Sequence, residues 1–121
     1  MPPPVTADED GGELIPTPLV SLKVLDHYFA RSFWEGNRAY ADAREPILAW
    51  YRHVLRADWG APANVKRDFG TASILRDGRA VFNIGGNKYR LVVWINYPYR
   101  VVYVRFIGTH AQYDRIDAQE V

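Results

Sequence analysis

Hydrophobic and polar residues alternate most regularly in the last third of the chain, where they predict two β-strands separated by a turn. Successive side chains of a strand point to opposite faces of a sheet. In the first strand, Lys88 to Asn96, one face carries Tyr89, Leu91, Val93 and Ile95. The other face carries Lys88, Arg90, Val92, Trp94 and Asn96. In the second strand, Val101 to Ile107, one face carries Val102, Val104 and Phe106. The other face carries Val101, Tyr103, Arg105 and Ile107. The pattern predicts a sheet with one apolar face and one face that bears basic residues.

Two shorter segments predict further strands immediately before this pair. They run from Thr71 to Leu75 and from Arg79 to Ile84. The connections are rich in the residues typical of tight hairpin turns. They are Arg76-Asp77-Gly78, Gly85-Gly86-Asn87 and Asn96 to Arg100. The second half of the chain therefore predicts an antiparallel meander of four strands.

Apolar residues at helical spacing predict a longer helix ahead of the meander. They are Ile47, Trp50, Tyr51, Val54 and Leu55, and the segment Asp42 to Glu45 before them resembles a capping box. Shorter helices are predicted from Asp26 to Trp34 and from Pro62 to Phe69, and a short first strand from Ser21 to Leu25. We expect an α+β fold with two or three helices packed on one face of the sheet. The other face is left to form a groove or an interface.

Composition divides the chain into two regions. Residues 1–20 are rich in Pro, Gly and acidic residues and contain no Lys or Arg, whereas residues 21–121 hold all 15 basic residues. We predict a disordered extension over residues 1–20 and one folded domain over residues 21–121. The extension is either an acidic arm that lies on the basic body or an addition from a start assigned too far upstream. No apolar run is long enough to cross a bilayer, and no basic leader precedes one, so we expect a cytoplasmic protein without a membrane partner.

Candidate chemistry gathers on the basic strand face and in the polar residues after the last strand. We expect Lys88, Arg90 and Arg105 on one side of the sheet, His110 and Tyr113 at its end, and the helices on the other side. Arginine binds phosphate through its fork of donors, and histidine, with an ordinary pKa of about 6.5, transfers protons near neutral pH. These residue types suit a phosphate-bearing ligand. Structural roles also remain open, namely a surface ion pair for the Arg, a hydrogen bond for the His and a packed ring for the Tyr. The chain has no Cys and three widely spaced His, which argues against a zinc site.

Three runs of sequence then match one family in order. AWYRHVLRADWGAPANVKRDF, VFNIGGNKYRLVVWINY and VRFIGTHAQYDRID resemble the HigB-type toxins of the RelE/ParE superfamily, which belong to bacterial type II toxin–antitoxin systems. The resemblance covers Leu22 to Asp117. It implies an mRNA interferase that cuts mRNA, typically on translating ribosomes, without a metal or other cofactor. It also implies a HigA-like antitoxin with a helix-turn-helix domain as the partner.

The resemblance assigns roles to particular residues. Metal-free RNA cleavage of this kind uses the 2′-OH as nucleophile and needs a base, an acid and cations that stabilise the phosphorane. The resemblance implies phosphate stabilisation by Arg90, which Lys88 can share, and proton transfer by His110 and Tyr113. The expected substrate-binding residues are Arg105, Asn83 and Asp114. Two other functions remain open: a ParE-like toxin that binds DNA gyrase without cutting RNA, and an RNA-binding regulator that does not cleave.

Overall fold

The computed structural model describes residues 23–25 and 33–121. The predictions for residues 1–22, and those for residues 26–32 of the first helix, lie outside the described residues. The described elements are β1 (Lys23–Leu25), the 3₁₀ helix η3 (Arg38–Ala43), α2 (Arg44–Arg56), α3 (Pro62–Asp68), β2 (Ser73–Ile74), the 3₁₀ turn η4 (Arg76–Gly78), β3 (Arg79–Ile84), β4 (Tyr89–Asn96), β5 (Val101–Thr109) and α4 (His110–Tyr113).

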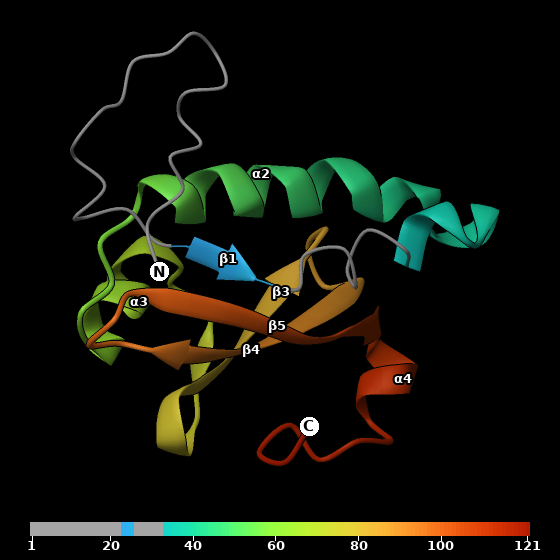
Figure 1. Cartoon of the computed structure of the whole chain (residues 1–121). Helices are drawn as coiled ribbons and strands as arrows, with labels where there is room; N and C mark the ends of the chain where they lie inside the picture. The colour runs from blue at the N-terminus through green and yellow to red at the C-terminus, as the bar shows by residue number, and fades with distance from the viewer. Residues whose placement is uncertain (1–22, 26–32) are drawn as a thin grey trace, which may run out of the picture.

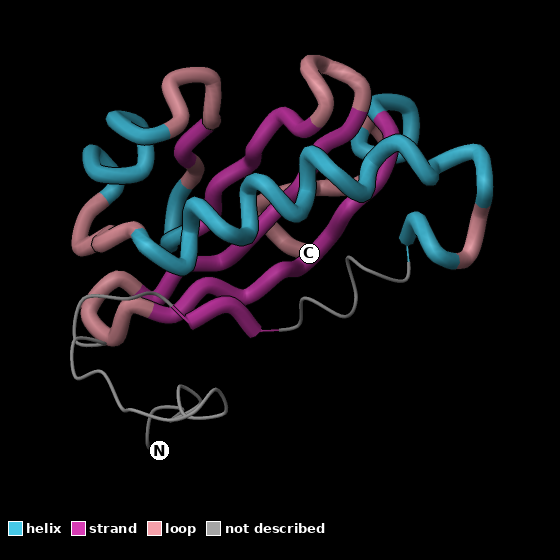
Figure 2. Tube along the Cα trace, turned by 90° about the horizontal axis from the view of Figure 1, so that it is seen from above, coloured by secondary structure: helices cyan, strands magenta, loops and turns pink. Residues whose placement is uncertain are grey.

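The strands form one five-stranded sheet in the order β1-β5-β4-β3-β2. Strands β2 to β5 pair antiparallel as consecutive hairpins, and β1 runs parallel to β5 at the sheet edge, with Lys23 opposite Val101. Helix α2 crosses one face of this sheet (Figures 1 and 2). The arrangement confirms the predicted α+β architecture, with helices on one face of a C-terminal meander and a short first strand.

The core lies between α2 and the sheet, and α3 is fixed to it by aromatic packing. The predicted stripe of α2 is buried at Ile47, Trp50 and Val54. Trp59, just before α3, is fully buried and stacks on Phe82 of β3 at 5.9 Å between ring centroids. Its indole nitrogen donates a 2.9 Å hydrogen bond to Oδ2 of Asp68, the last residue of α3. This bond is the largest cause that lowers the pKa of Asp68 below its usual value.

The predicted capping box of α2 is wrong. The residue that precedes the helix is Ala43, which makes no side-chain capping bond, and Asp42 lies inside η3. Because the 3₁₀ helix runs directly into α2, the Asp42 carboxylate is not placed to cap the helix. It accepts hydrogen bonds from Lys88, in the turn before β4, and from Tyr89, the first residue of β4.

The hairpin between β2 and β3 is the tight turn that the sequence predicts, although β2 itself is shorter than predicted. Asp77 and Gly78 both have positive φ angles, 54° and 84°, which matches the twist of a two-residue hairpin. A Cβ atom on Gly78 would lie 2.6 Å from the main-chain oxygen of Ile95, so only glycine fits there. The indole nitrogen of Trp94 donates a 2.8 Å hydrogen bond to the Asp77 oxygen and ties the turn to β4.

A β-bulge in β5 reverses the predicted alternation of that strand. Two neighbouring residues of β4 pair with Phe106 and Val104, which leaves Arg105 as an extra residue of β5. An extra residue exchanges the two faces for every side chain beyond it. Val104 and Ile107 are therefore both in the core, with exposed fractions of 3% and 6%. The prediction that Phe106 shares the face of Val104, and that Ile107 lies on the other face, is wrong for this reason.

The face of the sheet opposite α2, here called the outer face, is only partly open. It carries Val81, Asn83, Arg90, Val92, Trp94 and Phe106. The C-terminal tail, residues 115–121, turns back under this face (Figure 1). Val81 and Val92 are accordingly buried, with exposed fractions of 4% and 0%. Part of the face that the sequence predicts as a groove or an interface is therefore covered by the chain's own tail (Figure 1).

Hydrogen bonds fix the tail to the β2–β3 hairpin. The Gln119 side chain accepts from the main-chain nitrogen of Arg76 at 3.0 Å and donates to the main-chain oxygen of Arg76 at 2.7 Å. The Arg79 guanidinium donates to the Val121 main-chain oxygen at 2.8 Å. Within residues 23–25 and 33–121, no helix is long and apolar enough to cross a membrane.

Candidate active site on the outer face

Arg90 occupies the centre of the sheet near one end of the outer face. Its Cα partners are Asn83 on β3 and Gly108 on β5. The flanking residues of β4, Tyr89 and Leu91, are buried on the helix side, so the Arg90 side chain points to the outer face. Its guanidinium lies 5.9 Å from the centroid of the Tyr113 ring. Two separate elements thus bring an arginine and a tyrosine together.

The junction of β5 and α4 is rigid, and this rigidity places the polar residues after the strand. The Thr109 hydroxyl accepts from the Gln112 nitrogen at 3.1 Å, and the Gln112 side chain accepts from the Thr109 nitrogen at 2.9 Å, which is a reciprocal capping box. A Cβ atom on Gly108 would lie 2.6 Å from the Phe106 ring and 2.8 Å from the Gln112 side-chain oxygen. A side chain at position 108 would therefore disturb the junction.

His110 and Asp114 form an exposed pair on α4. Nδ1 of His110 lies 3.5 Å from Oδ2 of Asp114, and the two side chains are 51% and 61% exposed. When the proton is on Nδ1 and faces Asp114, Nε2 is left as an accessible base. His110 and Tyr113 belong to the same helical turn, and Tyr113 lies over Arg90. The structure thus places Tyr113 against Arg90 and His110 against Asp114, and the single turn of α4 links these two pairs.

Lys88 does not join this group. It lies in the turn before β4, not in the strand, and its ammonium forms an ion pair with Asp42 of η3. Asp42 also binds the hydroxyl of Tyr89, whose ring is buried in the core on the helix side. The hydrogen bond to Lys88 is the largest cause that lowers the pKa of Asp42, and the same bond raises the pKa of Lys88. The expectation that Lys88 lies on the strand face of Arg90 is wrong, because the carboxylate holds it at the turn.

Of the two remaining candidates, Asn83 lies next to Arg90, whereas Arg105 lies farther away. Asn83 is the direct Cα partner of Arg90, and its amide nitrogen donates to the Thr71 oxygen at 3.4 Å. Arg105 is exposed at the bulge, and Gly108 takes the position opposite Arg90. Arg105 therefore lies farther along β5, in the direction of Tyr103.

The structure adds Gly108 and Gln112, which are not among the predicted site residues and which hold the junction of β5 and α4 in place. Thr109 and Gln112 have the Thr-x-x-Gln spacing of a capping box, which is a signal present in the sequence. Within the described ranges, no three His, Asp or Glu side chains are grouped closely enough to hold a metal ion.

Asp42→Asn is expected to lower the thermal unfolding midpoint near neutral pH and to have a much smaller effect in acid. Because the folded-state pKa of Asp42 is lowered, its charged form stabilises the fold above the usual pKa of about 4, and this contribution is lost as the pH falls through the lowered value. Midpoints measured at about pH 7 and about pH 3 test this. Glu120→Gln, at an exposed tail residue, is the control and should show no such dependence. An Asp42→Asn deficit that is equal at both pH values would contradict the assignment.

Comparison with known proteins gives one family. A family model for the HigB toxin, a RelE-like toxic component of a toxin–antitoxin system, matches residues 43–116. An mRNA interferase HigB from Escherichia coli O6:H1 is 27% identical over 86 residues, which are 69% of this chain and 84% of that protein. An mRNA interferase toxin HigB from Escherichia coli K12 is 24% identical over 82 residues, 66% of this chain and 79% of that protein. The matched range of the family model includes Arg90, His110 and Tyr113.

Proposed function

The chain belongs to the family of HigB toxins, the RelE-like toxic components of toxin–antitoxin systems, and we propose that it is an endoribonuclease that cleaves mRNA. The observation that carries the proposal is the contact of Arg90 with Tyr113 beside the exposed His110–Asp114 pair. A cation and an imidazole thereby belong to the same end of the outer face. The relatives that share this part of the chain are named mRNA interferases.

The proposed reaction needs no group beyond the side chains of the site. The 2′-OH of one nucleotide attacks the adjacent phosphorus and forms a 2′,3′-cyclic phosphate, and the bond to the 5′-oxygen of the next nucleotide breaks. The imidazole of His110, oriented by Asp114, exchanges a proton with one of these two oxygens. The Arg90 guanidinium stabilises the negative charge that the phosphorane gains. Tyr113 transfers the other proton, or it stacks on a base while His110 takes the proton from the 2′-oxygen and gives it to the 5′-oxygen.

As the toxic component of such a system, the protein has an antitoxin as its partner. We propose that this antitoxin is a HigA-like protein with a helix-turn-helix domain. We further propose that the mRNA is cut while it is being translated on the ribosome. The open His110–Asp114 pair is compatible with access to a strand held by a large particle, since both side chains are more than half exposed.

The test is induced expression of the chain in bacteria, with the 5′ ends of cellular mRNA mapped and plasmid supercoiling followed in the same cultures. We expect growth arrest with new mRNA 5′ ends, and neither effect with His110→Ala. Growth arrest with intact mRNA and loss of supercoiling would favour the gyrase-directed alternative. Arrest by the His110→Ala protein at the wild-type rate, with the same cuts, would contradict the role of His110.

A further inference from the structure

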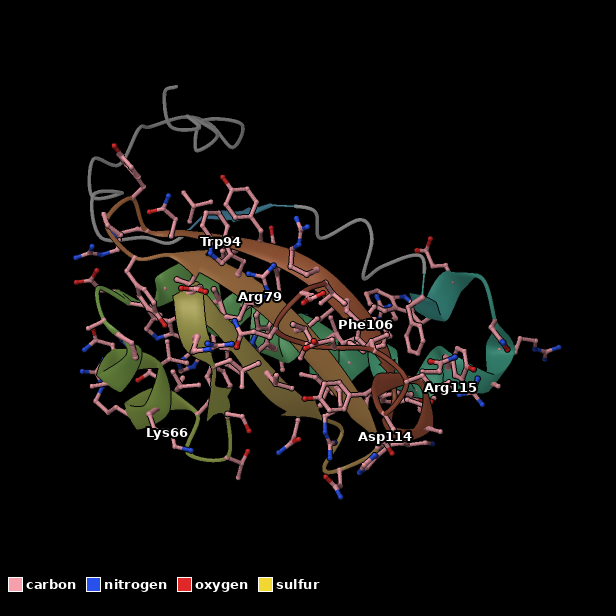
Figure 3. The ribbon with its side chains drawn as sticks, turned by 90° about the horizontal axis from the view of Figure 1, so that it is seen from below. Lys66, Arg79, Trp94, Phe106, Asp114 and Arg115 are labelled. Atoms are coloured by element: carbon pink, nitrogen blue, oxygen red, sulfur yellow. The ribbon has the colours of Figure 1, made fainter. Side chains whose placement is uncertain are left out.

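The outer face carries a second group of aromatic and basic residues, away from the site around Arg90. Trp94 of β4 and Tyr103 of β5 are direct Cα partners, and their rings stack with centroids 5.0 Å apart and planes 27° from parallel. Both side chains are partly exposed. Figure 3, which looks onto this face, shows Trp94 and Asp114 at opposite ends of the sheet. The pair is about 13 Å from Arg90, since Trp94 lies four positions beyond Arg90 on β4 and each position advances about 3.3 Å.

Two neighbouring residues, Asp77 and Gly78, hold the Trp94 ring in place. Its indole nitrogen donates a 2.8 Å hydrogen bond to the Asp77 oxygen. The ring also lies close to Gly78, since a Cβ atom there would be 3.2 Å from Cδ1 of Trp94. Aromatic rings fixed in this way lose little freedom when a flat partner stacks on them. The stacked pair is therefore a preformed surface for a planar group.

Basic side chains accompany these rings. Arg79 is the Cα partner of Trp94 on the third strand, and it is seen beside Trp94 in Figure 3. Its guanidinium is held by the tail, since it donates to the Val121 main-chain oxygen at 2.8 Å, and its Nε atom is buried, so Arg79 adds little charge to the open surface. Arg105 is exposed because the bulge turns it out of the sheet, and in the described part of the chain neither it nor Arg90 forms an ion pair with a carboxylate. Positive charge thus continues from the site towards the aromatic pair.

Phe106 connects the two groups. It lies beyond the bulge on the outer face, and its ring reaches over Gly108, the residue opposite Arg90. Aromatic rings and arginines consequently follow one another along β5, in the order Tyr103, Arg105, Phe106 and then the α4 residues. Alternation of stacking rings with cations is how proteins hold single-stranded nucleic acid without reading its sequence.

We propose that the Trp94–Tyr103 pair, with Arg105, is a base-stacking subsite for single-stranded RNA. The subsite binds a nucleotide of the same strand that is not one of the two flanking the cleaved bond, because the pair lies too far from Arg90 to reach those. This inference rests on the proposed function, and it names a subsite of the substrate that the cleavage chemistry does not require.

The test measures RNA binding to the His110→Ala protein, which should bind without cutting. The probes are a fluorescent single-stranded RNA of about ten nucleotides, within the range that such surfaces bind, and a dinucleotide. We expect Tyr103→Leu to weaken binding of the longer RNA roughly tenfold and to leave the dinucleotide unchanged. Tyr103→Phe should restore binding, since the ring is retained. Arg105→Gln, which changes an exposed residue, should weaken the longer RNA and make its binding less dependent on salt.

The matched control is Tyr99→Leu, because Tyr99 is 77% exposed in the β4–β5 turn and lies outside the proposed subsite. Thermal unfolding midpoints of all variants show whether a loss of binding reflects a loss of fold. Equal affinity of Tyr103→Leu and its parent for the longer RNA would overturn the proposal, as would an equal loss for both probes. Normal RNA binding with loss of antitoxin co-purification would assign the face to the antitoxin. Cleavage by the protein with His110 intact is tested separately, so the proposed function can stand when this subsite fails.

Discussion

Arg90→Ala is expected to lower the rate of RNA cleavage roughly 10²–10³-fold while the protein stays folded. The guanidinium lies on the outer face under Tyr113 and donates only long hydrogen bonds, 3.3 and 3.5 Å, to the main-chain oxygens of Asn87 and Tyr89. We therefore expect its removal to take away phosphate stabilisation and to change the fold little. Arg90→Lys keeps the charge but loses the planar fork of donors, and we expect it to recover only part of the rate. The measurement is the single-turnover rate constant on an mRNA that the wild-type protein cuts.

The control for this experiment is Arg52→Ala, which removes the same charge from the exposed side of α2 on the opposite face of the molecule. It should cleave at the wild-type rate. His110→Ala should show a loss of similar size or larger, roughly 10²–10⁴-fold, because it removes a group that moves a proton. Wild-type rates for both Arg90→Ala and His110→Ala would remove the catalytic assignment, although the family and the fold would stand.

Ile107→Ala is expected to reduce the free energy of unfolding by about 3 kcal/mol, the usual effect of truncating a core isoleucine. The matched variant is Phe106→Ala, one residue away. Because Phe106 is only half-buried on the outer face, we expect about 1 kcal/mol despite the larger side chain. Urea unfolding at equilibrium measures both values. The reverse order would mean that β5 runs without the bulge and that the simple alternation is correct.

The sequence predicted those parts of the fold that follow a regular period. Helix α2 has apolar residues at helical spacing, and the meander alternates along each strand between turns that contain Gly, Asn or Asp. Each of these signals is local, so it can be read before the tertiary structure is known. For the same reason the Arg90 side of β4 was predicted correctly, since that strand carries no extra residue.

The bulge and the position of Lys88 could not be read in this way. An arginine at a bulge has no distinguishing composition, and one inserted residue is enough to exchange Phe106 and Ile107. Lys88 is held by Asp42, which is distant in sequence, and the hydrogen bonds between Gln119 and Arg76 are equally non-local. Side chains that are placed by partners far along the chain leave no periodic trace. Candidate residues could therefore be named from the sequence, whereas the positions of Lys88 and Phe106 could not be predicted.

The pairing of β1 with β5 has a consequence for the order in which a newly made chain can fold. Lys23, from the first strand, must wait for Val101, from the last, so this edge of the sheet closes only after most of the chain has been synthesised. The same late segment carries Gly108, His110 and Tyr113, and it completes the surroundings of Arg90. An unfinished chain is expected to hold no assembled site. The mRNA that encodes this protein would then meet no active site on its own product until synthesis of the protein is nearly over.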